Sequence, residues 1–502
     1  MADKKSIIIK KLSSFGVGVK TFLFTNQAIR QTIVKNAFWL GVSNVGGRLL
    51  RAVIIIYAAR VLGAADWGVF SYAISLAALL TIFTDLGIGP VLTRETARAR
   101  DESSRARILS TAFLIKLILV GLGILVVFFL APHFTTIVEA KPLLPIIAFV
   151  LVFDALREFG FSFTRALEKM EWEAGLYLAT NVAIVVLGFI FLAIAPTVAS
   201  FTYAYALGTG IGMAATFFTL RHHFRHILYN FYFKLIKPIF AAAMPFAIAG
   251  VLGGLMLTTD ILIIGFFRSA EEVGFYSAAD RIIQLLYLLP GILATSSFPL
   301  IARLTGKDNL RLRRILERLI TIALAAALPM ALGGVILGKA IVELLFGTAY
   351  LAATLPFQIL IFTIIIRFPA VLLSNALFAF DKQKALVIYA ALGGVLNVTL
   401  DLLFIPTFGM VGSAWTTLVA QLVSNIYLWQ RMKRINYFAV LPSLGKVAVA
   451  TILMAVFTWL LSRAGVNLIL VIGLSAFFYL ALLSVLKEPL LREFKLILRS
   501  AV

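Results

Sequence analysis

Apolar runs of membrane-spanning length recur along almost the whole chain, and short polar segments separate them. A helix needs about 20 apolar residues to cross the ~30 Å hydrocarbon core of a bilayer. Because backbone groups in lipid must satisfy their own hydrogen bonds, such runs predict helices. Hydrophobic residues make up 61% of the chain and charged residues 14%, against about 45–50% and about 25% in soluble domains. The sequence therefore predicts an all-α polytopic membrane protein.

The apolar runs divide into fourteen segments, and an even number of crossings places both termini on the same side of the membrane. The predicted helices lie at about 36-62, 68-93, 108-131, 143-166, 174-195, 199-220, 239-266, 273-302, 316-338, 354-380, 385-404, 408-430, 445-462 and 465-486.

The distribution of basic residues predicts the orientation. Of the 45 Lys and Arg residues, 34 fall on the side that holds both termini, five on the opposite side and six within the spans. The positive-inside rule makes the side with 34 cytosolic. The net charge of +22 therefore reflects topology and contact with anionic lipids, so no nucleic-acid partner is predicted. We expect a multi-pass protein of the cell membrane with cytosolic termini.

Three short patterns recur in the same order at offsets of 207, 206 and 210 residues. Six crossings preserve orientation, so the recurrence predicts two parallel six-helix repeats with a cavity between them. The repeated pairs are Gly46-Gly47 and Gly253-Gly254, 68-73 and 274-279, and Ala166-Leu167 and Ala376-Leu377.

These observations predict five regions along the chain. Residues 1-34 are too broken by lysines for a cleaved signal peptide, so a cytosolic lead-in is expected. The other predicted regions are an N-terminal six-helix lobe at 35-222, a cytosolic linker at 223-237, a C-terminal six-helix lobe at 238-431, and two extra helices with a cytosolic tail at 432-502.

One segment of the chain carries a family resemblance. The stretch from Asn397 to Thr417, NVTLDLLFIPTFGMVGSAWTT, is similar to the polysaccharide flippases of the MOP exporter superfamily, as are 85-94 and the turn from Leu62 to Gly68. The resemblance covers about residues 35-485 and includes fourteen helices with an internal duplication.

The resemblance implies a V-shaped pair of six-helix lobes plus two C-terminal helices. It also implies a transporter that flips polyprenyl-diphosphate-linked oligosaccharide from the cytosolic to the outer leaflet, for surface polysaccharide or glycan assembly. Membrane lipids and other polysaccharide assembly proteins are the expected partners. The alternatives are a peptidoglycan-precursor lipid flippase, which also has fourteen helices, and a cation-coupled multidrug exporter of the same superfamily.

Arg48 and Arg51 are the leading candidates for substrate binding. They lie three residues apart on one helical face, about 12 to 15 residues from the cytosolic start of the helix and hence near mid-membrane. A charged side chain there costs at least ~2.5 to 3.5 kcal/mol, so it must face a cavity or a partner. Planar guanidinium groups match the oxygens of a diphosphate. The alternative is that carboxylates or carbonyls of neighbouring helices bind both arginines.

Three further arginines within the spans are candidates for the same cavity. Arg367 lies about 13 residues into its helix, and Arg281 follows Asp280, whose side chain points about 100° away. Arg157 follows Asp154 by three residues, so a structural ion pair is favoured there.

Other polar residues within the spans have less direct interpretations. Lys116 is expected to snorkel toward the cytosolic surface, and Asp85 is expected to form a structural ion pair. Asn397 and Asp401, one turn apart, offer oxygen ligands on one helical face and could bind a coupling Na⁺ or proton. The alternative is that they satisfy a helix end near Pro406.

Enzymatic, metal and cofactor chemistry is not predicted. The chain has no cysteine, and no pair of its four histidines falls within a span. The longest predicted outer loops, 132-142 and 339-353, are too short for an extramembrane catalytic domain. No cofactor other than a coupling Na⁺ or H⁺ is expected, and the predicted class is a transporter.

The orientation can be tested with single cysteines in this cysteine-free chain. An impermeant thiol reagent added to intact cells should label Thr136→Cys and Thr348→Cys, and should label Ser103→Cys only after the membrane is broken. Labelling of Ser103→Cys in sealed cells would reverse the orientation.

Overall fold

The computed structural model describes residues 29–225, 227–440 and 444–486. Within these ranges the chain is entirely helical apart from turns and short loops. The N-terminal half consists of α2 (Ile29–Asp85), α3 (Ile88–Arg98), α4 (Glu102–Leu125), α5 (Ala131–Phe134), α6 (Leu144–Ala166), α7 (Met170–Ile194), α8 (Val198–Thr219) and α9 (Arg221–Phe224), with the short helices η1 (Val126–Leu130) and η2 (Val138–Leu143).

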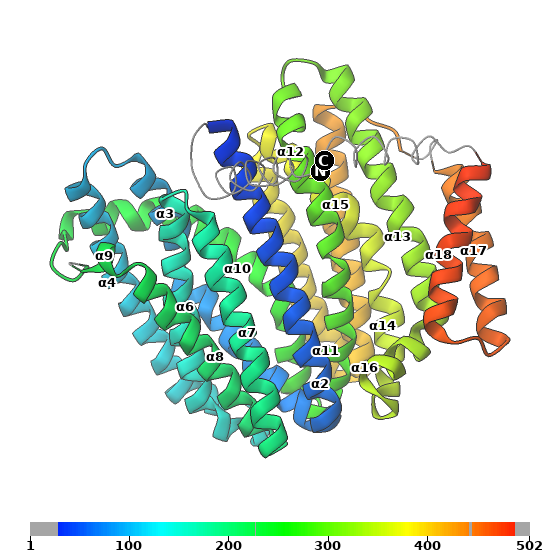
Figure 1. Cartoon of the computed structure of the whole chain (residues 1–502), viewed down its shortest axis with the longest axis horizontal. Helices are drawn as coiled ribbons and strands as arrows, with labels where there is room; N and C mark the ends of the chain where they lie inside the picture. The colour runs from blue at the N-terminus through cyan, green and yellow to red at the C-terminus, as the bar shows by residue number, and fades with distance from the viewer. Residues whose placement is uncertain (1–28, 226, 441–443, 487–502) are drawn as a thin grey trace, which may run out of the picture.

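The C-terminal half is built in the same way. It consists of η3 (Phe233–Leu235), α10 (Ile236–Phe267), α11 (Ala270–Leu286), α12 (Leu288–Leu304), α13 (Asn309–Phe346), η4 (Thr348–Ala353), α14 (Thr354–Leu360), α15 (Thr363–Ala379) and α16 (Gln383–Ile435). Two further helices follow, α17 (Gly445–Arg463) and α18 (Leu468–Val485). They pack on each other and on α13, at one edge of the molecule (Figure 1).

Two of these helices are too long for a single crossing. At ~1.5 Å per residue, the 57 residues of α2 and the 53 of α16 would each extend far beyond a ~30 Å hydrocarbon core. Each turns back at a glycine with positive φ, Gly63 (φ 78°) and Gly409 (φ 57°). A side chain would strain the backbone at both positions.

All fourteen predicted ranges fall mainly on helical residues, and the prediction of an all-helical polytopic membrane protein is confirmed. By length and apolar composition, nine helices of the described chain suffice to cross a membrane. A tenth span is obtained if the pair 348–360 and 363–379, bent by 47°, counts as one. The number of fourteen crossings stays a prediction. Residues 1–28 of the predicted lead-in at 1-34 lie outside the described residues, and so does the predicted tail from residue 487 onward.

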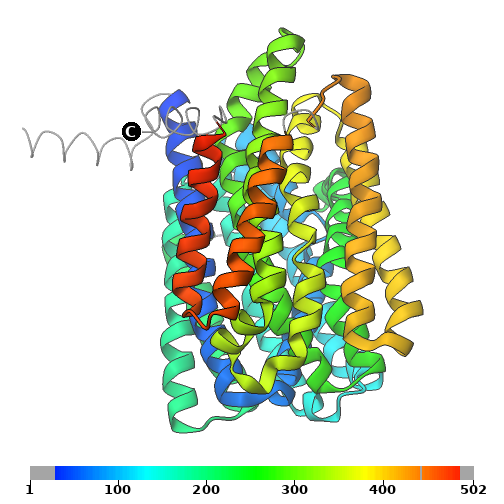
Figure 2. The same ribbon diagram turned by 90° about the vertical axis from the view of Figure 1, so that its right-hand side faces the viewer.

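Most helices of each half pack with one another, and the two halves converge at the lower end in Figure 1; toward the upper end they splay, except that α10 crosses over to pack on α2 and α3 of the N-terminal half. The turn between α12 and α13 rises above the other helix ends in both side views (Figures 1 and 2). At the lower end, α2 crosses the first turns of α11.

Gly68 and Gly274 make this crossing close, and they are corresponding residues of one repeated pattern. A Cβ at Gly68 would lie 1.7 Å from the Ala270 carbonyl oxygen, and a Cβ at Gly274 would lie 1.9 Å from the Ala64 oxygen. Each glycine therefore meets the carbonyl four residues before the other glycine. Such a reciprocal contact is what a two-fold relation between the halves would produce.

Hydrogen bonds from side chains to backbone join the halves around the same crossing. The Arg60 guanidinium donates to the carbonyls of Leu344 and Leu345 at the end of α13. The Tyr350 hydroxyl donates to the Ala59 carbonyl at 2.7 Å, and the Thr136 hydroxyl donates to the Gly265 carbonyl at 2.5 Å. These donors satisfy carbonyls near helix ends and fix the two halves to each other on this side.

A methyl group at the crossing should destabilise the protein. Because backbone atoms occupy the space, Gly68→Ala must push α11 away from α2, at a cost of ~1–3 kcal/mol, typical of overpacking. The thermal unfolding midpoint in detergent should fall. Gly473→Ala in α18 is the matched control, since no heavy atom lies within 4 Å of the position that its Cβ would take. Equal unfolding midpoints for the two variants would contradict the close crossing.

Candidate functional site

Arg51 lies within α2 and bonds to a neighbouring helix of the N-terminal half. Its Nε donates to Asn181 Oδ1 of α7 at 3.0 Å, and its guanidinium lies 5.7 Å from the centre of the Tyr205 ring of α8. The carboxylates of Asp154 and Glu158 lie near enough to act on it electrostatically. The half-buried guanidinium keeps donors that these contacts do not use.

Gly47 explains how Asn181 reaches Arg51. A Cβ at Gly47 would lie 2.3 Å from Tyr177 Cε1 and 2.9 Å from Asn181 Nδ2. The missing side chain therefore lets α7 approach α2 one turn before Arg51. Arg48, on the same helix, is exposed. Neither arginine forms an ion pair with any residue in the described ranges.

Arg157 belongs to the same half. It is 5% exposed, and its Nη2 lies 2.8 Å from Asp154 Oδ1 and 3.8 Å from Glu158 Oε1. The predicted structural pair with Asp154 is confirmed. Arg157 also lies over the Phe161 ring, 5.6 Å from its centre. Its charge is therefore largely compensated within α6.

Arg281 and Arg367 belong to the C-terminal half. The Arg281 guanidinium donates to Gln284 Oε1 at 3.2 Å, and Gln284 Nε2 donates to Asp280 Oδ2 at 2.5 Å. Gln284 thus connects the two adjacent charges, which do not pair directly. Arg367 of α15 lies 5.3 Å from the centre of the Tyr287 ring.

Four of the five candidate arginines therefore form two clusters, one in each half, and the exposed Arg48 stands apart from both. Arg51 and Arg157 share Asp154 and Glu158 as neighbours. In the other half, Arg281 lies beside Asp280 and Arg367 lies beside Tyr287, and Asp280 and Tyr287 are electrostatic neighbours of each other. Within the described part of the chain, the bonds and ion pairs of these arginines stay inside their own half.

Asn397 and Asp401 lie in a buried polar cluster that the sequence showed only in part. Asp260 of α10 accepts from the Tyr276 hydroxyl at 2.5 Å and from the Thr417 hydroxyl at 2.7 Å. Asn397 Nδ2 donates to Thr417 Oγ1 at 3.4 Å, and the Thr416 hydroxyl donates to Asp401 Oδ1. The Asp260 and Asp401 carboxyls are electrostatic neighbours.

The turn at Gly409 brings these groups together, because it folds the second part of α16 back along the first. The Glu272 carboxylate accepts from the Met410 amide at 3.0 Å, and the Arg268 Nε donates to the Ile405 carbonyl at 3.1 Å. Both bonds hold the turn against the start of α11. The sequence pattern did not identify four members of the cluster, because they lie on other helices or beyond the turn: Asp260, Tyr276, Thr416 and Thr417.

In the described part of the chain, the cluster contains buried oxygens that accept no hydrogen bond, and no basic side chain pairs with it. Within the described residues, three buried acceptor oxygens of the cluster lack a donor: Asp260 Oδ1, Asn397 Oδ1 and Asp401 Oδ2. The Asp260 and Asp401 carboxyls lie close enough to share a proton, and the Ser413 hydroxyl lies close enough to donate to Asp401. No ion pair to Asp260 or Asp401 is found in those ranges. No group of three or more His, Cys, Asp or Glu residues that could hold a metal occurs among the described residues. Two facing carboxyls with free oxygens fit a proton or an oxygen-coordinated monovalent cation.

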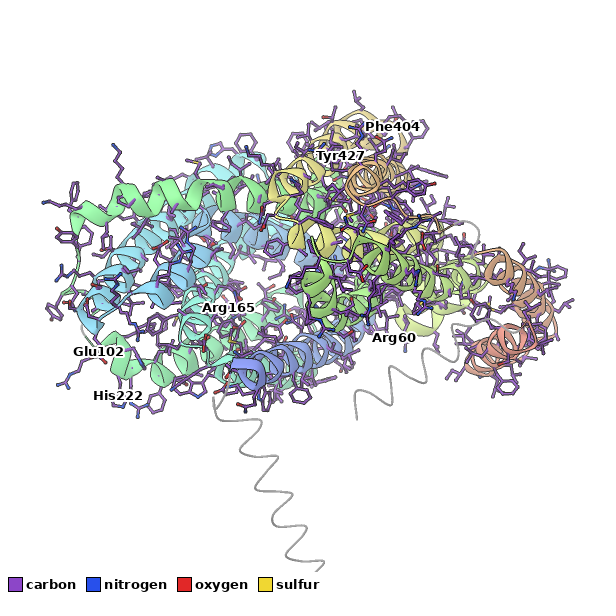
Figure 3. The ribbon with its side chains drawn as sticks, turned by 90° about the horizontal axis from the view of Figure 1, so that it is seen from above. Arg60, Glu102, Arg165, His222, Phe404 and Tyr427 are labelled. Atoms are coloured by element: carbon purple, nitrogen blue, oxygen red, sulfur yellow. The ribbon has the colours of Figure 1, made fainter. Side chains whose placement is uncertain are left out.

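Other ion pairs of the N-terminal half are structural. Lys116 was expected to snorkel, and this expectation is wrong: its side chain is 1% exposed, and its Nζ bonds to Asp85 Oδ1 at 3.0 Å. The expected ion pair of Asp85 is thereby confirmed. Arg165 forms two bonds to Glu173, at 2.9 and 2.5 Å, and lies among the N-terminal helices (Figure 3). These pairs join helix ends and leave Arg48 and Arg51 available.

Two family profiles match the chain. The profile of a polysaccharide biosynthesis protein family matches residues 33–305, and a MatE profile matches residues 245–403. The "Probable flippase AglR" of Haloferax volcanii is 32% identical over 171 residues, which cover 33% of this chain and 36% of that protein.

Two more distant relatives match over most of their length. The "Probable low-salt glycan biosynthesis flippase Agl15" of Haloferax volcanii is 21% identical over 395 residues, covering 78% of this chain and 82% of that protein. The "Putative O-antigen transporter" of Shigella flexneri is 21% identical over 397 residues, covering 76% and 93%.

Solved structures show a shared fold at low sequence identity. A "Lipid II flippase MurJ, inward closed conformation" superposes with a TM-score of 0.75 at 18% identity, covering 90% of this chain and 99% of that one. An "Inward-facing conformation of a multidrug resistance MATE family transporter of the MOP superfamily" gives a TM-score of 0.58 at 17% identity, covering 83% and 98%.

Proposed function

The chain belongs to the polysaccharide biosynthesis protein family of the MOP superfamily, a family of membrane transporters rather than enzymes, and we propose that it flips polyprenyl-diphosphate-linked oligosaccharide. The sugar head moves from the cytosolic to the outer leaflet of the cell membrane, where it serves surface polysaccharide or glycan assembly. The names of relatives that match over most of their length support a glycan substrate.

Arg51 is the observation that carries the proposal. It is a half-buried guanidinium within a membrane helix, bonded to the neutral Asn181 and forming no ion pair within the described chain. The cost of burying such a charge is offset when a ligand provides an anion. A diphosphate supplies the negative charge and the paired oxygens that match guanidinium donors. Further positive charge for the diphosphate would come from Arg48, Arg281 and Arg367. Arg157, whose charge Asp154 and Glu158 compensate, would contribute hydrogen-bond donors for the sugar.

A lipid-linked oligosaccharide needs such a protein because its head group cannot cross hydrocarbon unaided. Each unpaired polar group costs several kcal/mol in an apolar medium, and the barrier is ~30 Å thick. Polar and charged side chains between the two halves would replace water around the head while the polyprenyl chain stays in lipid.

We propose fourteen crossings, arranged as two six-helix lobes at 35-222 and 238-431 with α17 and α18 appended. The turns of α2 at Gly63 and of α16 at Gly409 support this number, because each doubles the crossings of one continuous helix. The reciprocal contact of Gly68 and Gly274 supports a duplication. The distribution of Lys and Arg supports cytosolic termini.

In this orientation the described conformation is closed on the outer side. The bonds made by Arg60, Thr136 and Tyr350 join the halves there. For alternating access, the lobes would separate at these contacts to release the head outward.

A coupling cation or proton would bind at Asp260, Asn397 and Asp401. Two buried carboxyls next to each other are unfavourable unless a cation or proton lies between them. Their unpartnered oxygens support binding of Na⁺ or H⁺. Binding would draw α10 and α16 together. The position of the C-terminal lobe would therefore depend on whether the ion is bound.

A peptidoglycan-precursor flippase is the second candidate. The fold similarity to the lipid II flippase, at a TM-score of 0.75, favours it. Lipid II shares the polyprenyl diphosphate, so the two candidates differ in the head group alone. A multidrug exporter is less well supported, because the unpaired Arg51 within the membrane suits an anionic rather than a cationic substrate.

Arg51→Ala should reduce flipping at least about tenfold, because the substrate would lose charge-assisted hydrogen bonds. The assay measures transfer of a polyprenyl-diphosphate sugar, and in parallel of lipid II, between the leaflets of liposomes. Arg51→Lys should keep part of the activity, since it retains the charge without the planar fork.

Arg94→Ala is the matched control, because Arg94 lies in α3, outside both arginine clusters, and pairs with Glu95. It should flip substrate at the wild-type rate. Equal rates in protein-free and wild-type liposomes would reject the flippase, and faster transfer of lipid II than of any oligosaccharide lipid would favour the second candidate.

Asp401→Asn and Asp260→Asn should each remove the acceleration of flipping by a Na⁺ or H⁺ gradient, because one carboxylate cannot replace the pair. The measurement compares rates with and without each gradient. Asp308→Asn is the control, since Asp308 is exposed and caps α13 at its cytosolic end. A normal gradient response in both variants would show that the coupling ion binds elsewhere.

A further inference from the structure

Buried polar atoms without a hydrogen-bond partner are concentrated in one part of the C-terminal half. Of the sixteen such side-chain atoms in the described chain, seven belong to Asp260, Arg281, Asn397, Asp401, Ser413, Gln421 and Asn425. Buried polar groups normally find a partner in the protein or in ordered water. A cluster of orphaned atoms therefore indicates bound water or an ion that the side chains surround.

Three of these residues lie along one face of α16. Ser413, Gln421 and Asn425, together with Thr417, are spaced by four residues, so their side chains follow one another along the helix. On α11, Tyr276, Asp280 and Gln284 have the same spacing.

The two rows face each other. Tyr276 Oη lies 3.3 Å from Thr417 Oγ1, and further along the amide of Gln421 lies beside the Tyr287 hydroxyl. That hydroxyl lies 2.6 Å from Thr363 Oγ1 of α15, and Asn425 donates to the Ile366 carbonyl at 3.2 Å. We call this set of residues the polar seam: Tyr276, Asp280 and Gln284 of α11, Tyr287 at its end, Thr363 of α15, and Ser413, Thr417, Gln421 and Asn425 of α16.

The polar seam leads from the cation cluster toward the cytosolic side. Counting ~1.5 Å per residue from the turn at Gly409, Thr417 lies about 12 Å along α16 and Asn425 about 24 Å along it. In the other direction Ser413 is one turn nearer the outer side than Thr417, and Glu272 and Arg268 bond to the backbone at the Gly409 turn. Two isoleucines lie between these groups and the two carboxyls along their own helices. Ile264 and Ile405 follow Asp260 and Asp401 by one turn toward the outer side, and both are 0% exposed.

We propose that the polar seam is the hydrated route by which the coupling cation exchanges between the Asp260–Asp401 cluster and the cytosolic side in this conformation. The inference rests on the coupling site of the proposed function and adds its path and direction. Gln421 and Asn425 supply oxygens that replace water around the passing cation, and Ile264 and Ile405 block the outer path.

Ordinary packing does not account for the polar seam. Polar residues between membrane helices normally bond across the interface. Here the side-chain amide oxygens of Gln421 and Asn425 have no hydrogen-bond donor, although the Asn425 amide nitrogen donates to the Ile366 carbonyl. Water is the partner that can reach both at once, provided that the space between the rows is open to it.

Thiol accessibility tests the route, because methanethiosulfonate reagents react with ionised thiols in contact with water. Gln421→Cys and Asn425→Cys are placed singly in the full chain, in inside-out vesicles that expose the cytosolic face. Ala420→Cys is the dry control on the same helix, at 1% exposure, and Leu422→Cys is the lipid-facing control, at 47% exposure. The reagent is the cationic ethylammonium form, added without substrate.

We expect both seam cysteines to react at least about tenfold faster than the two controls, as expected for water at a buried polar site. Addition of Na⁺, and separately acidification, should identify the coupling ion by slowing the cationic reagent relative to a neutral methanethiosulfonate, because an occupied cluster no longer attracts the cation. The ratio of the two rates removes the loss of thiolate that acid causes at every cysteine. Equal rates at seam and control positions would overturn the hydrated route. Faster labelling from the outer face would overturn its direction.

Fast labelling that neither Na⁺ nor acid slows would show water without a cation, and would overturn the exchange route. Because no substrate is present, these outcomes stay separate from the flipping assay, so the flippase can stand while the route fails. Gel-filtration profiles and unfolding midpoints of each variant establish that it is folded, and the second seam position decides the outcome if the first variant does not fold.

Discussion

The close crossing of α2 and α11 is the contact on which the arrangement of the two halves depends. Helices in lipid gain little from burying apolar surface against each other, so they associate through close packing and hydrogen bonds. Gly68 and Gly274 allow backbone to meet backbone, with each lacking Cβ directed at a carbonyl of the other helix. The bonds of Arg60, Thr136 and Tyr350 follow from this proximity, because their acceptors are backbone carbonyls near the same end of the molecule.

A crossing at one end has consequences for the other end. The halves converge where the glycines meet and splay toward the side that carries the α12–α13 turn (Figure 1). The halves also meet along α10, since a Cβ at Gly254 would lie 2.2 Å from Ile82 Cδ1 and a Cβ at Gly87 would lie 2.5 Å from the Ala243 carbonyl oxygen. Rocking about the crossing therefore requires α10 to bend, or to slide against α2 and α3, as well as an exchange of the hydrogen bonds at the lower end. The donors at this end bond to backbone carbonyls rather than to acidic side chains, so separating them strands no carboxylate without its partner.

The sequence predicted the helices well and the partners of charged side chains less well. Apolar length alone located the helical segments, because a lipid-exposed backbone has few alternatives. The pair of Asp154 and Arg157 could be predicted because helical spacing fixes it. The pair of Lys116 and Asp85 could not, since these residues lie on different helices and nothing along the chain states their distance. Asp260 was missed as a partner of Asp401 for the same reason, although Asn397 and Asp401 were visible one turn apart.

The two halves differ in the charge that they leave available, because only the C-terminal half leaves buried carboxyls without a basic partner in the described chain. In the N-terminal half, the carboxylates near Arg51 are used by Arg157, so the uncompensated group is a cation. In the C-terminal half, Asp260 and Asp401 bond to hydroxyls and leave negative charge, whereas Arg367, which lies over the Tyr287 ring and forms no ion pair in the described chain, leaves a separate positive charge. In the proposed cycle the substrate diphosphate binds at the arginines and the coupling cation at the two carboxyls. The two ligands therefore do not compete for one site, and each can neutralise its own site before the halves move through a medium in which bare charge is costly.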